Sequence, residues 1–223
     1  MTETEHSTAT SPMKRRHLVG GAVLGMLASA VGGLAGGVAL GQGAALPRQR
    51  PSGRQRFTDK VIIVTGGTSG IGRAATLMFA AEGGRVVFCG RNVERGAQVE
   101  TEARAAGGQA TFMRADVRDE ADVKALIDKT IGLYGGLDVA FNNAGISIEK
   151  PLHQLSAAEF DDVISTDLRG VFLSMKYQIP PMLQKGGSIV VTSSSNAIAT
   201  SPNRSAYSAA KRGLVGRLFR RKA

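Results

Sequence analysis

The 223-residue sequence predicts an α/β fold, in which a doubly wound parallel sheet of about five strands carries helices on both faces. Two observations support this fold class. From residue 57 onward, short apolar runs alternate with longer stretches of helical composition. The apolar runs show little alternation between apolar and polar residues, which is typical of strands that are covered on both faces.

The expected elements follow one another along the chain. Glu94, Glu120 and Glu159 fall in the first turns of three helices, where a negative charge complements the helix dipole. Glycine pairs at 107–108 and 135–136 end two helices. Right-handed crossovers give the strand order 3-2-1-4-5. The expected strands are 61–65, 85–89, 110–115, 137–142 and 187–192, and the expected helices are 70–82, 93–106, 120–134 and 157–184.

The net charge of +10 is unevenly distributed. Residues 57–210 carry 15 Lys and Arg against 16 Asp and Glu, so the expected domain is almost neutral. The positive excess lies in clusters at 14–16, 48–56 and 211–222. Terminal and linker charge runs are usually solvated or targeting features, so we expect no nucleic-acid partner.

Cysteine and histidine usage argues against disulfide and metal chemistry. The single cysteine, Cys89, lies within an apolar run, which indicates a buried thiol rather than a catalytic one. The histidines are His6, His17 and His153, and their spacing is not that of metal ligands. We therefore expect no metal site.

The N-terminal segment has the composition of a targeting sequence. Arg15-Arg16 precedes an uncharged stretch from residue 18 to 46, which is long enough to span a bilayer but contains nine glycines. This pattern resembles a twin-arginine export signal, and an uncleaved membrane anchor is the alternative. The protein is thus expected to be exported or membrane-anchored. The chain would comprise this segment at 1–46, a linker at 47–56 and the α/β domain at 57–223.

A glycine-rich turn directly follows the first expected strand. Its sequence, T-G-x-x-x-G-I-G, opens the first helix, where free backbone N–H groups and the positive end of the helix dipole suit a pyrophosphate. The second strand ends in Gly90-Arg91, where an acidic residue would bind the ribose 2′-hydroxyl of NAD. An arginine can instead pair with a 2′-phosphate, which favours NADP(H) over NAD(H). The candidate ligands in the turn are Gly66, Thr68, Ser69, Gly70, Ile71 and Gly72.

Tyr207 and Lys211 are four residues apart and share a face of the last expected helix. A phenol is too weak an acid to serve alone as a general base at neutral pH, and a neighbouring ammonium favours the phenolate. Ser194 lies thirteen residues before Tyr207, at the end of the fifth strand, with Ser193 and Ser195 beside it. The spacing favours Ser194 as the third member of the group.

Together these motifs resemble the short-chain dehydrogenase/reductase family over residues 57–214. The resemblance implies a Rossmann domain that transfers a hydride between NAD(P)(H) and a small alcohol or ketone. It further implies that Tyr207 is the acid or base, that Ser194 orients the substrate, and that Lys211 assists Tyr207 and binds the nicotinamide ribose. The remaining positions implied to bind the cofactor are Arg91, Asp116, Val117, Asn143, Ala144 and Gly145, together with Tyr207 and Lys211.

Two departures from the family pattern affect these expectations. Asp167 occupies the place of the family's fourth catalytic residue, an asparagine, and its carboxylate could pair with Lys211 or alter the proton relay. The chain also ends twelve residues after Lys211, whereas the family continues further. The domain is therefore expected to be incomplete at its C-terminus, which exposes the fifth strand and makes the usual homo-oligomer doubtful. The alternative function is a catalytically impaired, nucleotide-binding remnant.

Overall fold

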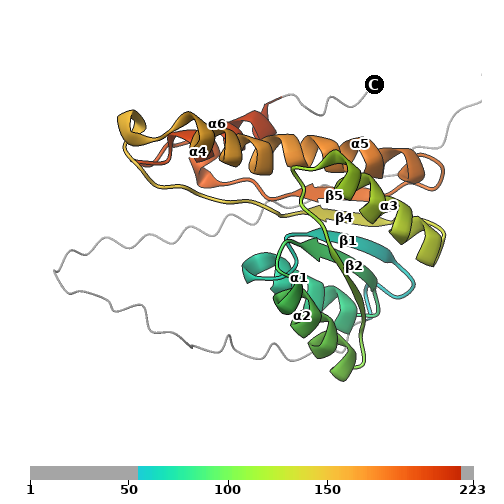
Figure 1. Cartoon of the computed structure of the whole chain (residues 1–223). Coiled ribbons are helices and arrows are strands. Elements are labelled where there is room, and N and C mark those ends of the chain that lie inside the picture. The colour runs from blue at the N-terminus through green and yellow to red at the C-terminus, as the bar shows by residue number, and fades with distance from the viewer. Residues whose placement is uncertain (1–54, 217–223) are drawn as a thin grey trace, which may run out of the picture. The chain divides into compact units, whose positions relative to one another are not determined.

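The computed structural model describes residues 55–216. The predicted export or anchor segment at 1–46, nearly all of the predicted linker, and residues 217–223 lie outside the described residues. Five parallel strands form one sheet in the order β3-β2-β1-β4-β5, with helices between successive strands (Figure 1). The predicted fold class and strand order are confirmed.

The observed strands agree with the predicted ones to within two residues at each end. The central strand β1 (Val61–Thr65) is flanked by β2 (Arg85–Gly90) and β4 (Val139–Asn142). The outer strands are β3 (Gln109–Arg114) and β5 (Ser188–Val191). The carboxyl ends of all five strands therefore meet at one edge of the sheet.

Three of the described helices begin at residues whose side chains cap them. Asn92 accepts the N–H of Arg95, and Ser156 forms a reciprocal capping box with Glu159. Gly135 ends one helix in the left-handed conformation, with a φ of 74°. The helices are α1 (Gly70–Ala81), α2 (Val93–Ala105), α3 (Glu120–Tyr134), α4 (Ala157–Ile164), α5 (Gly170–Met182) and α6 (Ser205–Val215), with short 3₁₀ turns η1 (Leu152–Gln154) and η3 (Ser195–Ala197).

The long helix predicted at 157–184 is interrupted. One π-helical turn, η2 (Ser165–Arg169), joins α4 to α5, and the helical backbone continues through both junctions. The predicted single regular helix is therefore wrong at this point. Single π turns are rare and occur frequently at functional sites.

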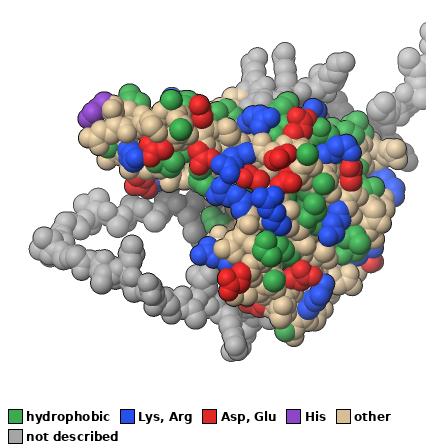
Figure 2. Space-filling view, in the orientation of Figure 1, with side chains coloured by type: hydrophobic (Ala, Val, Ile, Leu, Met, Phe, Trp, Pro, Cys, Tyr) green, Lys and Arg blue, Asp and Glu red, His purple; other side chains and the backbone are tan. Residues whose placement is uncertain are grey.

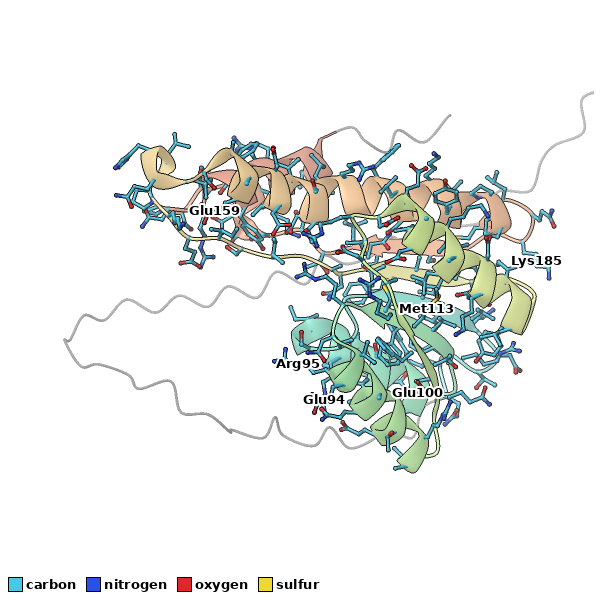
Figure 3. All side chains as sticks on the ribbon, viewed as in Figure 1. Glu94, Arg95, Glu100, Met113, Glu159 and Lys185 are labelled. Carbon is cyan, nitrogen blue, oxygen red and sulfur yellow. The ribbon has the colours of Figure 1, made fainter. Side chains whose placement is uncertain are left out.

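Each face of the sheet is covered by its own pair of helices. Successive residues of β1 point to opposite faces, so Ile62 and Val64 pack against α1 and α2, whereas Ile63 packs against α3 and α5. Burying both faces explains why the central strands are continuously apolar. The edge strand β3 is held to α2 by a side chain, because the Glu100 carboxylate accepts the backbone N–H of Phe112 at 3.0 Å. Figure 3 labels Glu100 on α2.

Strand β5 departs from this pattern. It is the edge of the sheet on its side, and the side chain of Val190 is 53% exposed. The prediction that every strand is covered on both faces therefore holds for β1 and β2 but not for β5 within the described part of the chain.

The surface of the described residues is mixed in charge. On the face shown in Figure 2, Lys and Arg are interspersed with Asp and Glu. Arg56, the last residue of the predicted linker, pairs with Glu82 at the end of α1 through two hydrogen bonds of 2.5 and 2.6 Å. Within residues 55–216, none of the helices combines the length and the apolar character needed to cross a membrane.

Candidate active site

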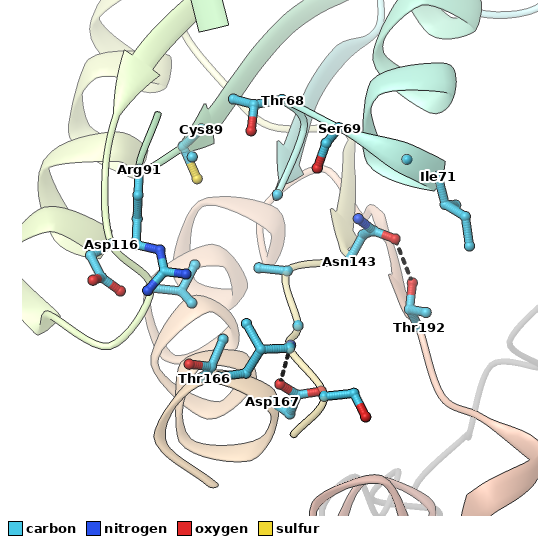
Figure 4. A pocket seen from close by; sticks show the side chains of 18 of the residues that line it. Thr68, Ser69, Ile71, Cys89, Arg91, Asp116, Asn143, Thr166, Asp167 and Thr192 are labelled. Atoms are coloured by element: carbon cyan, nitrogen blue, oxygen red, sulfur yellow. Dashed lines mark hydrogen bonds between the residues drawn. The ribbon is translucent and has the colours of Figure 1, made fainter. Parts of the chain in front are cut away.

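A cavity of about 420 Å³ opens at the carboxyl edge of the sheet, between the ends of β1, β2 and β4 (Figure 4). Strand order reverses between β1 and β4, which is where doubly wound sheets bind their ligands. With one exception, the predicted cofactor residues line this cavity. They are Gly66, Thr68, Ser69, Gly70, Ile71, Arg91, Asp116, Val117, Asn143, Ala144, Gly145, Tyr207 and Lys211.

The glycine-rich turn forms one wall. Gly66 and Gly70 have φ values of +68° and +53°, which side chains rarely adopt. A Cβ on Gly66 would lie 2.8 Å from the Cα of Ala144, whereas one on Gly70 would meet nothing within 4 Å. The Ser69 side chain does not cap α1 within the described structure, so the N–H groups of the first turn remain available to an anion. The turn therefore fits a bound pyrophosphate.

Gly72 is the exception among the predicted cofactor residues, because it does not line the cavity. A Cβ at this position would lie 2.1 Å from the carbonyl oxygen of Gly66 and 2.6 Å from Nδ2 of Asn143. Gly72 therefore allows α1 to pack directly against the turn and the end of β4.

The ends of β2 and β3 form the second wall. A Cβ on Gly90 would lie 2.6 Å from Cγ2 of Thr68, so this position keeps the turn close to β2. Arg91 is exposed and lines the cavity, and its guanidinium reaches toward the side of Asp116 (Figure 4). Hydrogen bonds from Arg118 hold the pKa of Asp116 below its ordinary value, with a smaller contribution from the charge of Arg91.

The two asparagines at the end of β4 have different environments. Asn142 is buried and exchanges two hydrogen bonds of 2.9 Å with Gln178 of α5. Asn143 faces the cavity, and its Oδ1 accepts the hydroxyl of Thr192 at 3.2 Å (Figure 4). The Thr65 hydroxyl accepts the backbone N–H of Asn143 at 3.0 Å. Asn142 therefore holds α5 against the sheet, while Asn143 shapes the cavity.

Three predicted catalytic residues meet at the other end of the cavity. Lys211 and Asp167 are 3% and 0% exposed, and Nζ of Lys211 lies 3.1 Å from Oδ2 of Asp167. Nζ also donates to the carbonyl oxygen of Thr192 at 3.1 Å and lies 5.4 Å from the centre of the Tyr207 ring. The expected pairing of Asp167 with Lys211 is therefore present. Burial raises the pKa of Asp167, and the nearby ammonium opposes this shift.

Ser194 lies apart from this group. It is half-buried, it caps η3, and its Oγ accepts the N–H of Asn196 at 3.2 Å. It does not line the cavity. Its neighbours Ser193 and Ser195 are exposed, so Ser194 remains the best-placed serine of the three.

The cavity is also lined by residues that the sequence motifs did not assign to the cofactor or catalytic site. The strand-ending Thr192 is the most connected, because its hydroxyl binds Asn143 and its carbonyl oxygen binds Lys211. Thr192 lies two residues before Ser194. Its position at the end of a predicted strand is the sequence signal that could have identified it as a site residue. The others are Cys89, Gly90, Ala115, Ile146, Ser147 and Thr166.

Comparison with known proteins identifies the family. Residues 60–220 match the family model described as short chain dehydrogenase. The chain is 43% identical over 163 residues to a 2,5-dichloro-2,5-cyclohexadiene-1,4-diol dehydrogenase of Sphingobium indicum, covering 72% of this chain and 64% of the relative. It is 41% identical over 162 residues to a 3beta-hydroxysteroid dehydrogenase of Mediterraneibacter gnavus, covering 72% of this chain and 59% of the relative.

A solved structure gives the same result. The crystal structure of levodione reductase matches with a TM-score of 0.70 and 39% sequence identity, covering 72% of this chain and 64% of that protein. The chain thus spans 59–64% of the length of the relatives described here. The matched region includes the glycine-rich turn and the Tyr207–Lys211 helix, and the family binds a nicotinamide dinucleotide. The chain belongs to the short-chain dehydrogenase family.

Proposed function

We propose that this protein is an NADP(H)-dependent oxidoreductase that interconverts a small alcohol and the corresponding carbonyl compound. The observation that carries the proposal is that one cavity joins the glycine-rich turn to Tyr207 and Lys211. An anion site and a phenol–ammonium pair thus face the same space. The names of the relatives, two dehydrogenases of alcohols and one reductase, support the same reaction class.

In this proposal, residues at one end of the cavity bind the cofactor and residues at the other end act on the substrate. The first turn of α1 and the glycine-rich turn bind the pyrophosphate, and Lys211 binds the nicotinamide ribose. Bound at this position, the cofactor supplies or accepts the hydride. Tyr207 donates a proton to, or takes one from, the substrate oxygen, and Ser194 orients that oxygen. Because Ser194 lies outside the cavity wall, we expect substrate binding to bring the η3 segment inward.

The preference for NADP(H) rests on Arg91. No carboxylate stands at the end of β2, and the exposed guanidinium of Arg91 is free to form charge-assisted hydrogen bonds with a 2′-phosphate. Arg91→Glu should weaken NADPH binding by about 10-fold to 100-fold, because the variant loses this pairing and adds repulsion. NADH binding should change much less.

Fluorescence titration of NADPH and NADH tests this preference. Arg95→Glu is the matched control, because Arg95 is also exposed, lies four residues later and does not line the cavity. Unaltered NADPH affinity in Arg91→Glu would show that Arg91 is only a solvated residue. An equal loss for both dinucleotides would also reject a role in selecting the 2′-phosphate.

The alternative function is a nucleotide-binding protein with impaired catalysis. The position of Ser194 outside the cavity wall favours it. Turnover on a panel of secondary alcohols and ketones, measured beside NADPH binding, separates the two functions. The proposed enzyme should turn over at least one substrate and lose this activity in Tyr207→Phe, whereas binding without turnover would support the alternative.

We also propose that residues 1–46 act as a twin-arginine export signal. The support comes from the sequence, in which Arg15-Arg16 precedes an uncharged, glycine-rich stretch. Replacing both arginines by lysine in the full chain should block export while leaving the protein soluble inside the cell. Unchanged localisation would reject this role and leave the membrane anchor as the alternative.

A further inference from the structure

The chemical end of the cavity contains a buried ion pair. Asp167 and Lys211 both line the cavity, their side chains are at most 3% exposed, and the two charged atoms lie 3.1 Å apart. Oδ1 of Asp167 also accepts the N–H of Ile146 at 2.7 Å (Figure 4). These contacts fix the carboxylate beside the ammonium that faces the Tyr207 ring.

Gly145 and the π turn leave space for this carboxylate. A Cβ on Gly145 would lie 2.8 Å from Oδ2 of Asp167, so a side chain there would push the carboxylate away from Lys211. Asp167 itself lies in the π turn η2, which sets the direction of its side chain. The backbone on both sides is therefore arranged around the ion pair.

The other charges around this group are balanced among themselves. Asp162 on α4 acts on Asp167 but is paired with Arg118. Arg204 at the start of α6 pairs with Glu149, and Glu159 pairs with Lys150. Three other charged residues lie on α6 or on the elements that pack against it. Arg212 donates to the carbonyl oxygens of Ala197 and Ile198, Arg169 donates to the carbonyl oxygen of Arg118, and Asp161 is exposed. The charge facing Tyr207 is therefore set by Lys211 and Asp167.

We propose that Asp167 is a positioning residue that pairs with Lys211, weakens the field of the ammonium at Tyr207, and thereby sets the pH at which Tyr207 can act as the base of alcohol oxidation. An ammonium alone stabilises a phenolate, but a carboxylate 3.1 Å from that ammonium cancels most of its field at the phenol. Alcohol oxidation requires Tyr207 as the base, whereas carbonyl reduction requires it as the acid. This inference rests on the proposed function.

In carbonyl reduction the proton and the hydride go to different atoms of the substrate. The O–H bond of Tyr207 breaks and an O–H bond forms on the substrate oxygen, while the carbonyl carbon gains the hydride of NADPH. The carbonyl compound is reduced and NADPH is oxidised to NADP⁺. A proton from solvent then restores the phenol of Tyr207.

A spectroscopic titration in the absence of cofactor and substrate tests whether Asp167 affects the titration of Tyr207. The chain has three tyrosines, so subtracting the tyrosinate absorbance of Tyr207→Phe from that of the parent isolates the titration of Tyr207. In Asp167→Asn this component should move to lower pH by about one unit or more, because Lys211 is no longer neutralised. Asp161→Asn is the control, since it removes an equal charge from an exposed site, and it should leave the component in place.

Kinetics then test the effect on catalysis. In Asp167→Asn the acid limb of the pH profile of kcat/KM for alcohol oxidation should move to lower pH by the same amount, about one unit. An unmoved Tyr207 component in Asp167→Asn, or an equal shift in Asp161→Asn, would overturn the inference even if the enzyme is active. The expected shift without turnover by any variant would instead reject the proposed function.

Gly145→Ala provides a second route if Asp167→Asn does not fold. It displaces the carboxylate without changing the number of charges. It should move the Tyr207 component in the same direction by a smaller amount, and an unmoved component in a folded Gly145→Ala protein would also overturn the inference.

Discussion

The reciprocal amide pair between β4 and α5 gives a stability prediction that can be worked out from its contacts. Asn142 and Gln178 are 1% and 0% exposed and exchange two hydrogen bonds of 2.9 Å. Gln178→Leu would leave one donor and one acceptor of Asn142 without these partners. Each unsatisfied buried group costs about 1–3 kcal/mol. The added apolar burial returns about 1 kcal/mol, so the free energy of unfolding should fall by about 1–5 kcal/mol.

Equilibrium denaturation of a double-mutant cycle tests this estimate. Asn142→Leu should cost a similar amount, because it strands the amide of Gln178 instead. The double variant removes both amides and should recover much of the stability, with a coupling energy of about 2 kcal/mol. Single variants that lose less than about 1 kcal/mol, or losses that simply add, would refute the reasoning. Either result would mean that the two amides are not the exclusive partners seen here.

Three other residues give predictions of different kinds. Gly72→Ala should lower the free energy of unfolding by about 3 kcal/mol or more, because its Cβ would lie 2.1 Å from a backbone oxygen of Gly66; a melting temperature within about 3 °C of the parent would contradict this. Burial raises the pKa of the Cys89 thiol to about 12, so Ellman's reagent should label it at mildly alkaline pH only after denaturation. Rapid labelling of the native protein would contradict that burial. Arg118 holds the pKa of Asp116 low, so Asp116→Asn should be destabilising at neutral pH, with a deficit that shrinks as the pH falls below about 4. A deficit that does not change with pH would show that the ion pair is not its source.

Local patterns in the sequence were sufficient to predict most of the fold. The apolar run of β1 and the glycine turn after it are strong signals, and both were predicted to the residue. The strand ends were less certain because pairing across the sheet decides them. Gly90, for example, belongs to β2 because its carbonyl oxygen accepts the N–H of Ala115 at 3.2 Å. Nothing in the composition of residues 157–184 distinguishes a π turn from an α-helix.

The candidate site was less predictable than the fold. The motif spacing indicated that Tyr207, Lys211 and Asp167 belong to one site. It did not indicate that Lys211 and Asp167 form a buried ion pair of 3.1 Å. The length and burial of this pair depend on how α6 packs against η2, which no local pattern encodes. The same holds for Thr192, whose two contacts come from separate elements. Tertiary packing decides which side chains become partners across the fold. The local sequence, in contrast, is enough to show which residues stand at the strand ends.

The π turn also has a consequence for how the gene can vary. A π turn inserts an extra residue into a helix, so α5 is offset in phase from α4 by about 100°, the rotation of one residue. A single-codon deletion within Ser165–Arg169 would remove that offset. It would either rotate the face of α5 that carries Gln178 away from the sheet or turn Asp167 away from the cavity. Length changes in this segment should therefore be far less tolerated than substitutions, even on the exposed side of the helix.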